Sequence, residues 1–146
     1  MPRIERNASI VWEGNVARGG GTITAGTGAF EALPYSLAAR VGKLEGKTSP
    51  EELLASAHGG CLTMSMATEL TQAGTPPGRL ETTCEVVMDE VPGQGHQIVA
   101  SHVRLHAVVD GVDAGTLAET LERADAGCPF STLLRNAGVE VTVDLV

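Results

Sequence analysis

The sequence is poor in aromatic residues, in basic charge and in long apolar runs. Only 3% of its 146 residues are aromatic, and 10 Lys and Arg residues stand against 18 Asp and Glu residues, a formal net charge of -8. Phosphate backbones repel a chain of this charge, and so few aromatic side chains offer little for base stacking. No apolar run approaches the ~20 residues that cross a bilayer. These absences argue against a nucleic-acid partner and against a membrane protein.

Cysteine is scarce as well, with three residues in the chain. Three cysteines without a secretory signal pattern indicate a reducing compartment, where structural disulfide frameworks are rare, so we expect a cytoplasmic protein. Internal repeats and low-complexity tracts are also missing. A hydrophobic content of 42% with 19% charged residues fits one compact domain over residues 1–146.

The first third of the sequence carries strand and turn signals. Residues 8–13 and 18–25 contain β-branched residues on either side of a turn signal at Gly14, a pattern typical of a hairpin. Residues 34–40 are predicted to form another short strand, and residues 42–47 an exposed loop.

The strongest local signal is a helix start in the stretch Ser49 to Glu52. It supplies an N-cap serine, a proline at the first helical position and a glutamate at the third. Apolar residues then recur at helical spacing, which predicts a helix from Pro50 to Ala73. In this geometry the Glu52 side chain folds back on the Ser49 backbone N–H as a structural cap, whereas Glu51 is left free.

Cys61 lies within this predicted helix, ten residues after Glu51. On a straight helix ten residues correspond to ~15 Å of rise, too far for the two side chains to touch. If Glu51 serves Cys61, it therefore comes from another subunit. The alternative is a solvated acid in the first helical turn, where the helix dipole favours negative charge.

The second half predicts a sheet with helices on one side. Residues 82–89 and 99–109 alternate in polarity and form a predicted long hairpin. Asp113 caps a helix, Pro129 opens a shorter one, and a last strand covers residues 139–146. The expected fold class is α+β, with the helices on one side of an antiparallel sheet.

Cys61 and Cys128 occupy positions that suit redox chemistry. Cys128 lies between Gly127, which can close one helix, and Pro129, which suits the first turn of the next. A sulfur at such a helix N-terminus is favoured as thiolate. Cys61 is surrounded by apolar and small residues, where desolvation raises a thiol pKa unless a cation is brought in from elsewhere. Cys61 therefore needs an activating group.

Other candidate sites have weaker signals. His58 and Cys61 have the spacing of a metal pair, but without a matching ligand cluster a packed histidine is favoured. Cys84 lies on the apolar face of a predicted strand and is expected in the core. The three remaining histidines show no carboxylate spacing that suggests a relay, so a Cys-His hydrolase is a minor alternative.

Several segments of the chain resemble the OsmC/Ohr family of cysteine-based hydroperoxide reductases, and together they cover nearly all of it. The segments are residues 12–14, 18–19, 21–22, 34–40, 48–61 and 126–131. The most specific are the Pro-Glu-Glu-Leu helix opening with Cys61 ten residues after its first glutamate, and the distant Gly-Cys-Pro around Cys128. Pro34, Tyr35 and Arg40 resemble the OsmC branch more than the organic hydroperoxide resistance branch.

This resemblance implies an OsmC-like fold with antiparallel sheets and a long central helix, in an intertwined homodimer with active sites at the subunit interface. It implies Cys61 as the peroxidatic cysteine and Cys128 as the resolving cysteine. It also implies that Arg40 and Glu51 activate the first thiol, with Arg18 as the position used in the other branch. No cofactor is implied. The expected partners are a small hydroperoxide and an external dithiol, for which a lipoyl protein is one candidate.

The expected activity is that of a thiol peroxidase. The Cys61 thiolate becomes a sulfenic acid, Cys128 closes a disulfide with it, and the external dithiol restores both thiols. Apolar residues around Cys61 favour organic hydroperoxides over hydrogen peroxide. The alternative from another function class is a non-catalytic, stress-related binding protein that uses an apolar pocket at the dimer interface.

The sequence departs from the family pattern beside both cysteines. Gly59 and Gly60 stand where the family usually has alanines, and Leu62 where it usually has an aromatic residue. Two glycines weaken a helix by roughly 1 kcal/mol each relative to alanine, and they permit either a close helix approach or local bending. Phe130 stands where a smaller aliphatic residue is common, which bears on the shape of the pocket and on substrate choice.

Overall fold

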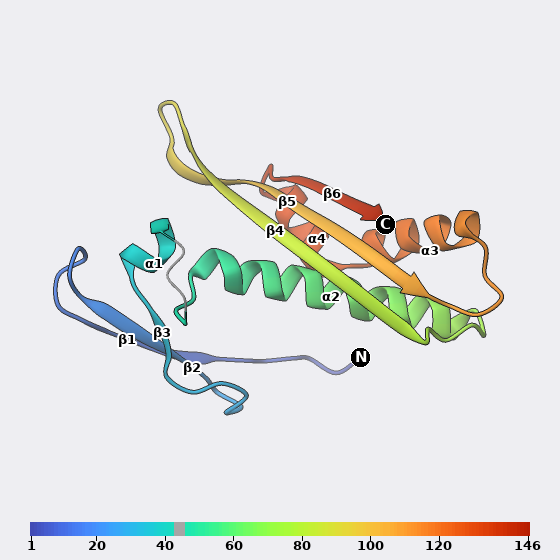
Figure 1. Cartoon of the computed structure of the whole chain (residues 1–146), viewed down its shortest axis with the longest axis horizontal. Helices are drawn as coiled ribbons and strands as arrows, with labels where there is room; N and C mark the ends of the chain where they lie inside the picture. Colours follow the sequence, from blue (N-terminus) through green and yellow to red (C-terminus); the bar gives the residue numbers. More distant parts are fainter. Residues whose placement is uncertain (43–45) are drawn as a thin grey trace. The chain divides into compact units, whose positions relative to one another are not determined.

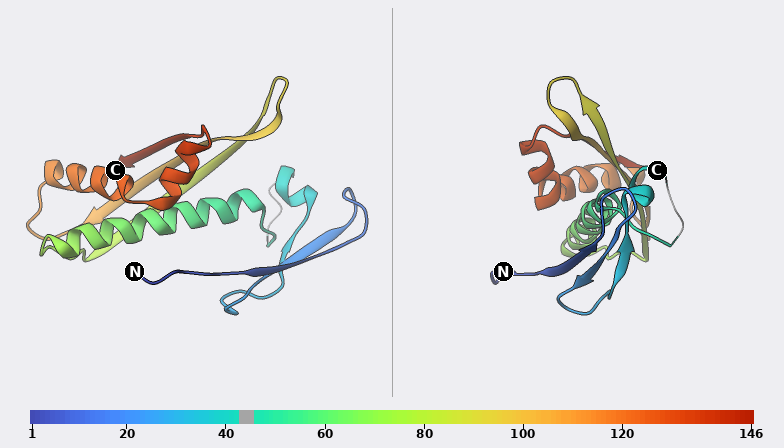
Figure 2. Two further views of the ribbon diagram at one scale, coloured as in Figure 1. Left: turned by 180° about the vertical axis from the view of Figure 1, so that it is seen from behind. Right: turned by 90° about the vertical axis from the view of Figure 1, so that its left-hand side faces the viewer.

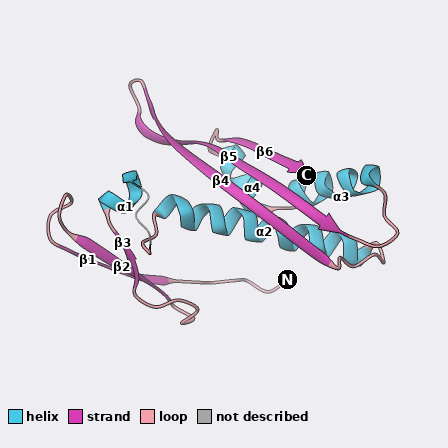
Figure 3. Ribbon diagram, viewed as in Figure 1, coloured by secondary structure: helices cyan, strands magenta, loops and turns pink. Residues whose placement is uncertain are grey.

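The computed structural model describes residues 1–42 and 46–146 (Figure 1, Figure 3). The chain divides into two compact units, Met1–Leu53 and Leu54–Val146. In chain order the elements are β1 (Ala8–Glu13), β2 (Gly20–Ala25), β3 (Leu33–Tyr35), α1 (Leu37–Gly42), α2 (Pro50–Gln72), β4 (Arg79–Val91), β5 (Gly95–Val108), α3 (Ala114–Ala126), α4 (Pro129–Asn136) and β6 (Glu140–Leu145). Among the described residues, no helix is both long enough and apolar enough to cross a membrane.

The first unit holds a three-stranded antiparallel sheet in the order β1-β2-β3. The expected hairpin is confirmed, with Ile10 opposite Ile23 and Gly14 in the turn at a φ of 86°. Gly21 is required by a close approach, because a Cβ there would lie 2.5 Å from Cε1 of Tyr35. The ring of Tyr35 therefore packs over the β2 backbone.

The third predicted strand ends earlier than expected. Only Leu33–Tyr35 is extended, and the chain then turns into the helix α1, so the strand prediction for residues 36–40 was wrong. Ser36 is the reason, because its Oγ accepts a hydrogen bond from the Ala39 N–H at 3.1 Å and so caps the helix. The residues that follow Ser36 are also strong helix formers. Part of the loop expected at 42–47 lies outside the described residues.

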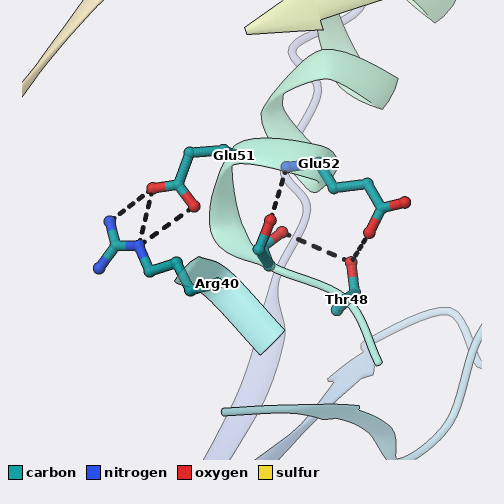
Figure 4. Close-up of polar contacts among 5 residues, drawn as sticks. Arg40, Thr48, Glu51 and Glu52 are labelled. Carbon is teal, nitrogen blue, oxygen red and sulfur yellow. Dashed lines mark hydrogen bonds and ion pairs between the residues drawn. The ribbon is translucent and has the colours of Figure 1, made fainter. Parts of the chain in front are cut away.

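The start of α2 has the expected cap. Ser49 Oγ accepts a hydrogen bond from the Glu52 N–H at 3.2 Å, and the Glu52 carboxylate accepts one from the Thr48 hydroxyl at 3.0 Å (Figure 4). Both bonds are local to the helix start. The Glu52 carboxylate contributes there by binding the Thr48 hydroxyl, and its capping bond to the Ser49 backbone N–H stays a prediction. The helix then runs to Gln72, one residue short of the predicted end.

The second unit is a sheet covered on one face by helices (Figure 2). β4 and β5 form the predicted long hairpin, with Cys84 opposite Val103 and a register shift between Val87 and Met88. β6 departs from the expected antiparallel pattern, because it runs parallel to β5. The reason is the connection between them, in which α3 and α4 form a crossover that returns the chain in the same direction.

One hydrophobic cluster joins the helices to the sheet. It comprises Leu62, Met66, Leu70, Val103, Leu105, Leu117, Leu121, Ala124 and Cys128. The opposite face of the sheet carries exposed polar residues such as Glu81 and Glu85, which confirms the predicted alternation. The same cluster fixes where the thiols lie, because Cys128 belongs to it and Cys61 and Cys84 pack against it.

Candidate active site

The second unit brings Cys61 and Cys128 together. Cys128 is the N-cap residue of α4, with Pro129 in the first turn, and it is 0% exposed. Cys61 is half-buried on α2 and packs against the cluster that contains Cys128. Both side chains are free thiols. Two residues 67 positions apart in sequence thus meet because a helix N-terminus is packed onto the middle of α2.

The surroundings of Cys61 favour its protonated form. Burial raises the pKa of the Cys61 thiol, and the neighbouring thiol of Cys128 raises it further, whereas the backbone N–H of Phe130 lowers it. The net direction is upward. This direction agrees with the expectation that Cys61 needs an activating cation.

The first unit brings Arg40 and Glu51 together (Figure 4). Arg40 Nε lies 2.9 Å and 3.1 Å from the two Glu51 carboxylate oxygens, and its Nη2 lies 2.5 Å from Oε1. This fork fixes the plane of the guanidinium. Burial opposes ionisation of Glu51, but hydrogen bonds from Arg40 and from its own backbone outweigh it and lower its pKa.

The pair remains accessible on the arginine side. The Arg40 side chain is 38% exposed, whereas the Glu51 side chain is 15% exposed. A pocket of about 220 Å³ lies beside Arg40 and is lined largely by apolar groups, including Trp12 and Tyr35. The two rings pack with their centroids 5.5 Å apart. A charged group at the edge of an apolar pocket suits a ligand with one polar end.

Arg18 is placed differently. It lies in the turn between β1 and β2, where its backbone N–H donates to Asn15 Oδ1 at 2.9 Å, and its side chain is exposed. Of the two predicted arginines, Arg40 is the one that the structure pairs with Glu51.

His58 makes buried polar contacts that the sequence analysis did not predict. It is 0% exposed, and its Nδ1 and Nε2 lie 2.7 Å from Ser101 Oγ and 2.8 Å from Ser131 Oγ. The packed-histidine interpretation is confirmed, but both serines were missed. One signal was available in the sequence, since His58 precedes Cys61 by three residues and Ser131 follows Cys128 by three.

The two glycines before Cys61 have different surroundings. A Cβ on Gly59 would lie 3.1 Å from the Cβ of Cys84, so this glycine permits the close approach of β4 to α2. A Cβ on Gly60 would meet no atom of the described residues within 4 Å. Cys84 was expected in the core; it is half-buried and packs against the core cluster, with its sulfur 3.5 Å from Ser101 Oγ.

The described ranges contain no group of three or more His, Cys, Asp and Glu residues that could hold a metal ion. His58 and Cys61 are the metal pair considered from the sequence, and both ring nitrogens of His58 already face serine hydroxyls. The second unit offers two neighbouring thiols, and the first unit offers a guanidinium beside an apolar pocket.

Comparison with known proteins gives consistent results. The family model described as OsmC-like protein matches residues 42–144. "Peroxiredoxin OsmC" of Escherichia coli is 34% identical over 141 residues, covering 97% of this chain and 95% of that protein. The "Organic hydroperoxide resistance protein" of Xanthomonas axonopodis pv. citri is 30% identical over 99 residues, covering 67% and 66%.

Solved structures share the fold at low identity. An OsmC-like protein of unknown function from Vibrio cholerae has a TM-score of 0.81 at 14% identity, covering 99% of this chain and 100% of that one. An organic hydroperoxide resistance protein OsmC from Legionella pneumophila has a TM-score of 0.74 at 20% identity, covering 98% of both chains. At these identities the likeness shows the fold: α+β, with largely antiparallel sheets and a long central helix.

Proposed function

Because the chain belongs to the family of OsmC-like proteins, we propose that it reduces organic hydroperoxides through a pair of cysteine thiols. The observation that carries the proposal is the meeting of Cys61, half-buried on α2, with Cys128 at the start of α4. Two free thiols in contact can form a disulfide once one of them is oxidised. The names of the relatives support the same class of substrate.

The first step is attack of the Cys61 thiolate on the outer oxygen of the hydroperoxide. The S–O bond forms as the O–O bond breaks, so sulfur is oxidised to sulfenic acid and the peroxide is reduced. The leaving alkoxide takes a proton and departs as the alcohol. No bound cofactor enters this step.

The second step closes the disulfide. The Cys128 thiol attacks the sulfur of the Cys61 sulfenic acid, and the S–OH oxygen leaves as water. An external dithiol then reduces the disulfide by two thiol–disulfide exchanges and is itself oxidised to a disulfide. Cys128 thereby protects Cys61 from irreversible oxidation.

Arg40 and Glu51 supply the activating charge in this proposal. A guanidinium near Cys61 lowers the pKa that burial raises, and it stabilises the oxygen that leaves the peroxide. Glu51 holds the guanidinium in plane through the observed fork. The pocket beside Arg40 would take the organic part of the peroxide.

The charge is proposed to come from a second subunit. In ideal helix geometry the ten residues from Glu51 to Cys61 rise ~15 Å, beyond the reach of one side chain. The face of α2 near Cys61 also carries Met64, 74% exposed in the single chain, and Gly60 with open space beside it. A partner helix packed there would bury this apolar surface and complete two sites by symmetry.

Thiol counting tests the proposal. The reduced protein is mixed with one equivalent of cumene hydroperoxide, and free thiols are then titrated in denaturant. We expect two of the three free cysteines to disappear, with recovery after a dithiol is added. A protein that only binds peroxides would keep all three thiols, and that result would exclude the enzyme.

A further inference from the structure

The start of α4 meets α2 through two pairs of side chains with the same spacing. His58 and Cys61 lie one helical turn apart on α2, and Cys128 and Ser131 lie one turn apart at the start of α4. Residues three apart on a helix lie on the same face. His58 Nε2 lies 2.8 Å from Ser131 Oγ, and the Cys61 thiol interacts with that of Cys128. The two contacts are thus neighbours in antiparallel register.

The contacts of His58 with the two serines are buried and polar, and each ring nitrogen has a hydroxyl partner. His58, Ser101 and Ser131 are each 0% exposed. Burial lowers the pKa of His58, an effect that Asp125 opposes and Arg135 reinforces. The neutral ring donates from one nitrogen and accepts at the other, and each serine hydroxyl can take the complementary role. A buried bond of this kind is specific, because removing one partner leaves the other unsatisfied.

His58 also has a fixed anchor on its far side. Its Nδ1 lies 2.7 Å from Ser101 Oγ on β5, a strand in the centre of the sheet. The ring therefore connects three elements: β5, α2 and the first turn of α4. The His58 Nδ1 also lies 4.0 Å from the sulfur of Cys84 on β4. Of these contacts, the one to Ser131 is the contact that reaches the segment carrying Cys128.

We propose that His58 is a positioning residue for the resolving step, holding Cys128 in register with Cys61 through Ser131. The inference rests on the proposed disulfide chemistry. A disulfide requires its sulfurs ~2.05 Å apart and its Cβ atoms ~3.8 Å apart, so a small displacement of the start of α4 disfavours closure. With the register held, the Cys61 sulfenic acid is captured by Cys128 before a second peroxide oxidises it to sulfinic acid.

Two serine variants distinguish the positioning of Cys128 by His58 from a general contribution of His58 to packing. Ser131→Ala removes the bond to the α4 start. Ser101→Ala, the matched control, removes the bond on the other side of the same ring, together with the contact of Ser101 to the sulfur of Cys84. Each reduced variant is equilibrated with glutathione and its disulfide, and the Cys61–Cys128 disulfide is quantified by alkylation and mass spectrometry. We expect its equilibrium constant to fall roughly tenfold in Ser131→Ala and to stay within about twofold of wild type in Ser101→Ala.

A second readout follows the fate of Cys61 under excess cumene hydroperoxide. Ser131→Ala should yield more sulfinic acid and less disulfide, whereas the first oxidation of Cys61 should keep its rate. A role in overall stability alone would not change this partition. Equal effects of the two serine variants, or no effect of Ser131→Ala in a folded protein, overturn the proposal.

His58 variants carry the test if Ser131→Ala does not fold. The amide of His58→Gln can hydrogen-bond both serines, so this variant should recover disulfide formation that His58→Leu loses; equal losses overturn the proposal. The glutathione equilibrium needs no peroxide. A wild-type protein that forms the disulfide there but consumes no hydroperoxide contradicts the proposed function, while the comparison among variants still decides the role of His58.

Discussion

At the scale of single residues, the two sulfurs have unequal surroundings. Cys61 is half-buried with a pKa raised by burial and by its neighbour, whereas Cys128 is fully buried at a helix start. Only a sulfur that a peroxide can approach can attack it. The residue level therefore favours Cys61 as the attacking thiol and Cys128 as the thiol that follows.

Replacing each cysteine in turn should give different failures. Cys61→Ser should abolish peroxide reduction, because the attacking sulfur is gone. Cys128→Ser should permit one turnover and then stall or over-oxidise, since no thiol captures the sulfenic acid. Peroxide consumption per protein, followed by mass spectrometry of Cys61, checks both. Equal multi-turnover activity in the two variants would contradict the two-cysteine mechanism.

Replacing Arg40 should move the pH dependence of the oxidation step. Without the guanidinium, burial keeps the pKa of Cys61 raised, so the thiolate forms only at higher pH and the profile shifts to the alkaline side. At neutral pH the rate should fall roughly tenfold for each pKa unit of that shift. Arg40→Lys should recover only part of the rate, because an ammonium cannot form the planar fork with Glu51.

Arg18→Ala is the matched control for this experiment. Rapid-mixing oxidation rates of the two alanine variants, measured from about pH 5 to about pH 10, give both profiles. The fluorescence of Trp12, the only tryptophan, reports on the pocket beside Arg40. If Arg18→Ala carries the alkaline shift and Arg40→Ala behaves as wild type, the activating arginine is Arg18.

At the scale of elements, α2 combines strong local helix signals with Gly59, a residue of low helix propensity in the helix interior. Ser49 and Pro50 define its start in sequence and in structure. Gly59 weakens the helix by its own propensity, yet β4 approaches so closely that a Cβ at this position would lie 3.1 Å from the Cβ of Cys84. Packing between elements, and not helix stability, explains this glycine.

Alanine substitutions at the two glycines should therefore differ. At a protein concentration low enough for the chain to be monomeric, Gly60→Ala should raise the unfolding midpoint, since alanine favours the helix by ~1 kcal/mol and meets open space in the single chain. Gly59→Ala should lose that benefit or destabilise, because its Cβ would lie 3.1 Å from the Cβ of Cys84. Urea unfolding at one fixed protein concentration compares them. A gain of equal size at Gly59 would mean that β4 moves away without cost.

At the scale of the whole molecule, the two units carry different parts of the proposed site. The first unit holds the Arg40–Glu51 pair and its pocket, and the second holds the thiols and His58. In the proposed mechanism, neither described unit holds all of the groups that the reaction uses. If the reaction needs both the Arg40–Glu51 pair and the thiols, activity depends on dimer formation.

The protein should accordingly be a dimer at micromolar concentration. Dimerisation would cover exposed Met64 and bring the guanidinium of one subunit to the thiol of the other. Sedimentation velocity over a dilution series, with peroxidase activity measured at each concentration, tests this. A stable monomer with full activity would refute the shared site.

The sequence by itself determined the features that short-range interactions control, namely turns, helix starts and helix caps. The Gly14 turn, the helix starts at Pro50 and Pro129 and the Asp113 cap all follow from short-range propensities, and the structure contains each of them. The short helix α1 was missed because a single serine cap at Ser36 competes with a strand-like neighbourhood, and short segments give little periodicity to separate the two.

Only the tertiary structure decided which distant residues meet. The parallel pairing of β6 and the bonds of His58 to two serines join residues far apart in sequence. The pairing of Cys61 with Cys128 also joins distant residues, and it was expected from the resemblance to the OsmC/Ohr family, not from local patterning. Such contacts depend on how helices pack onto a sheet, which leaves no periodic trace in the chain. The residue types in the sequence indicated thiol chemistry. Packing determined which side chains contact one another, because burial and register are properties of the assembled fold.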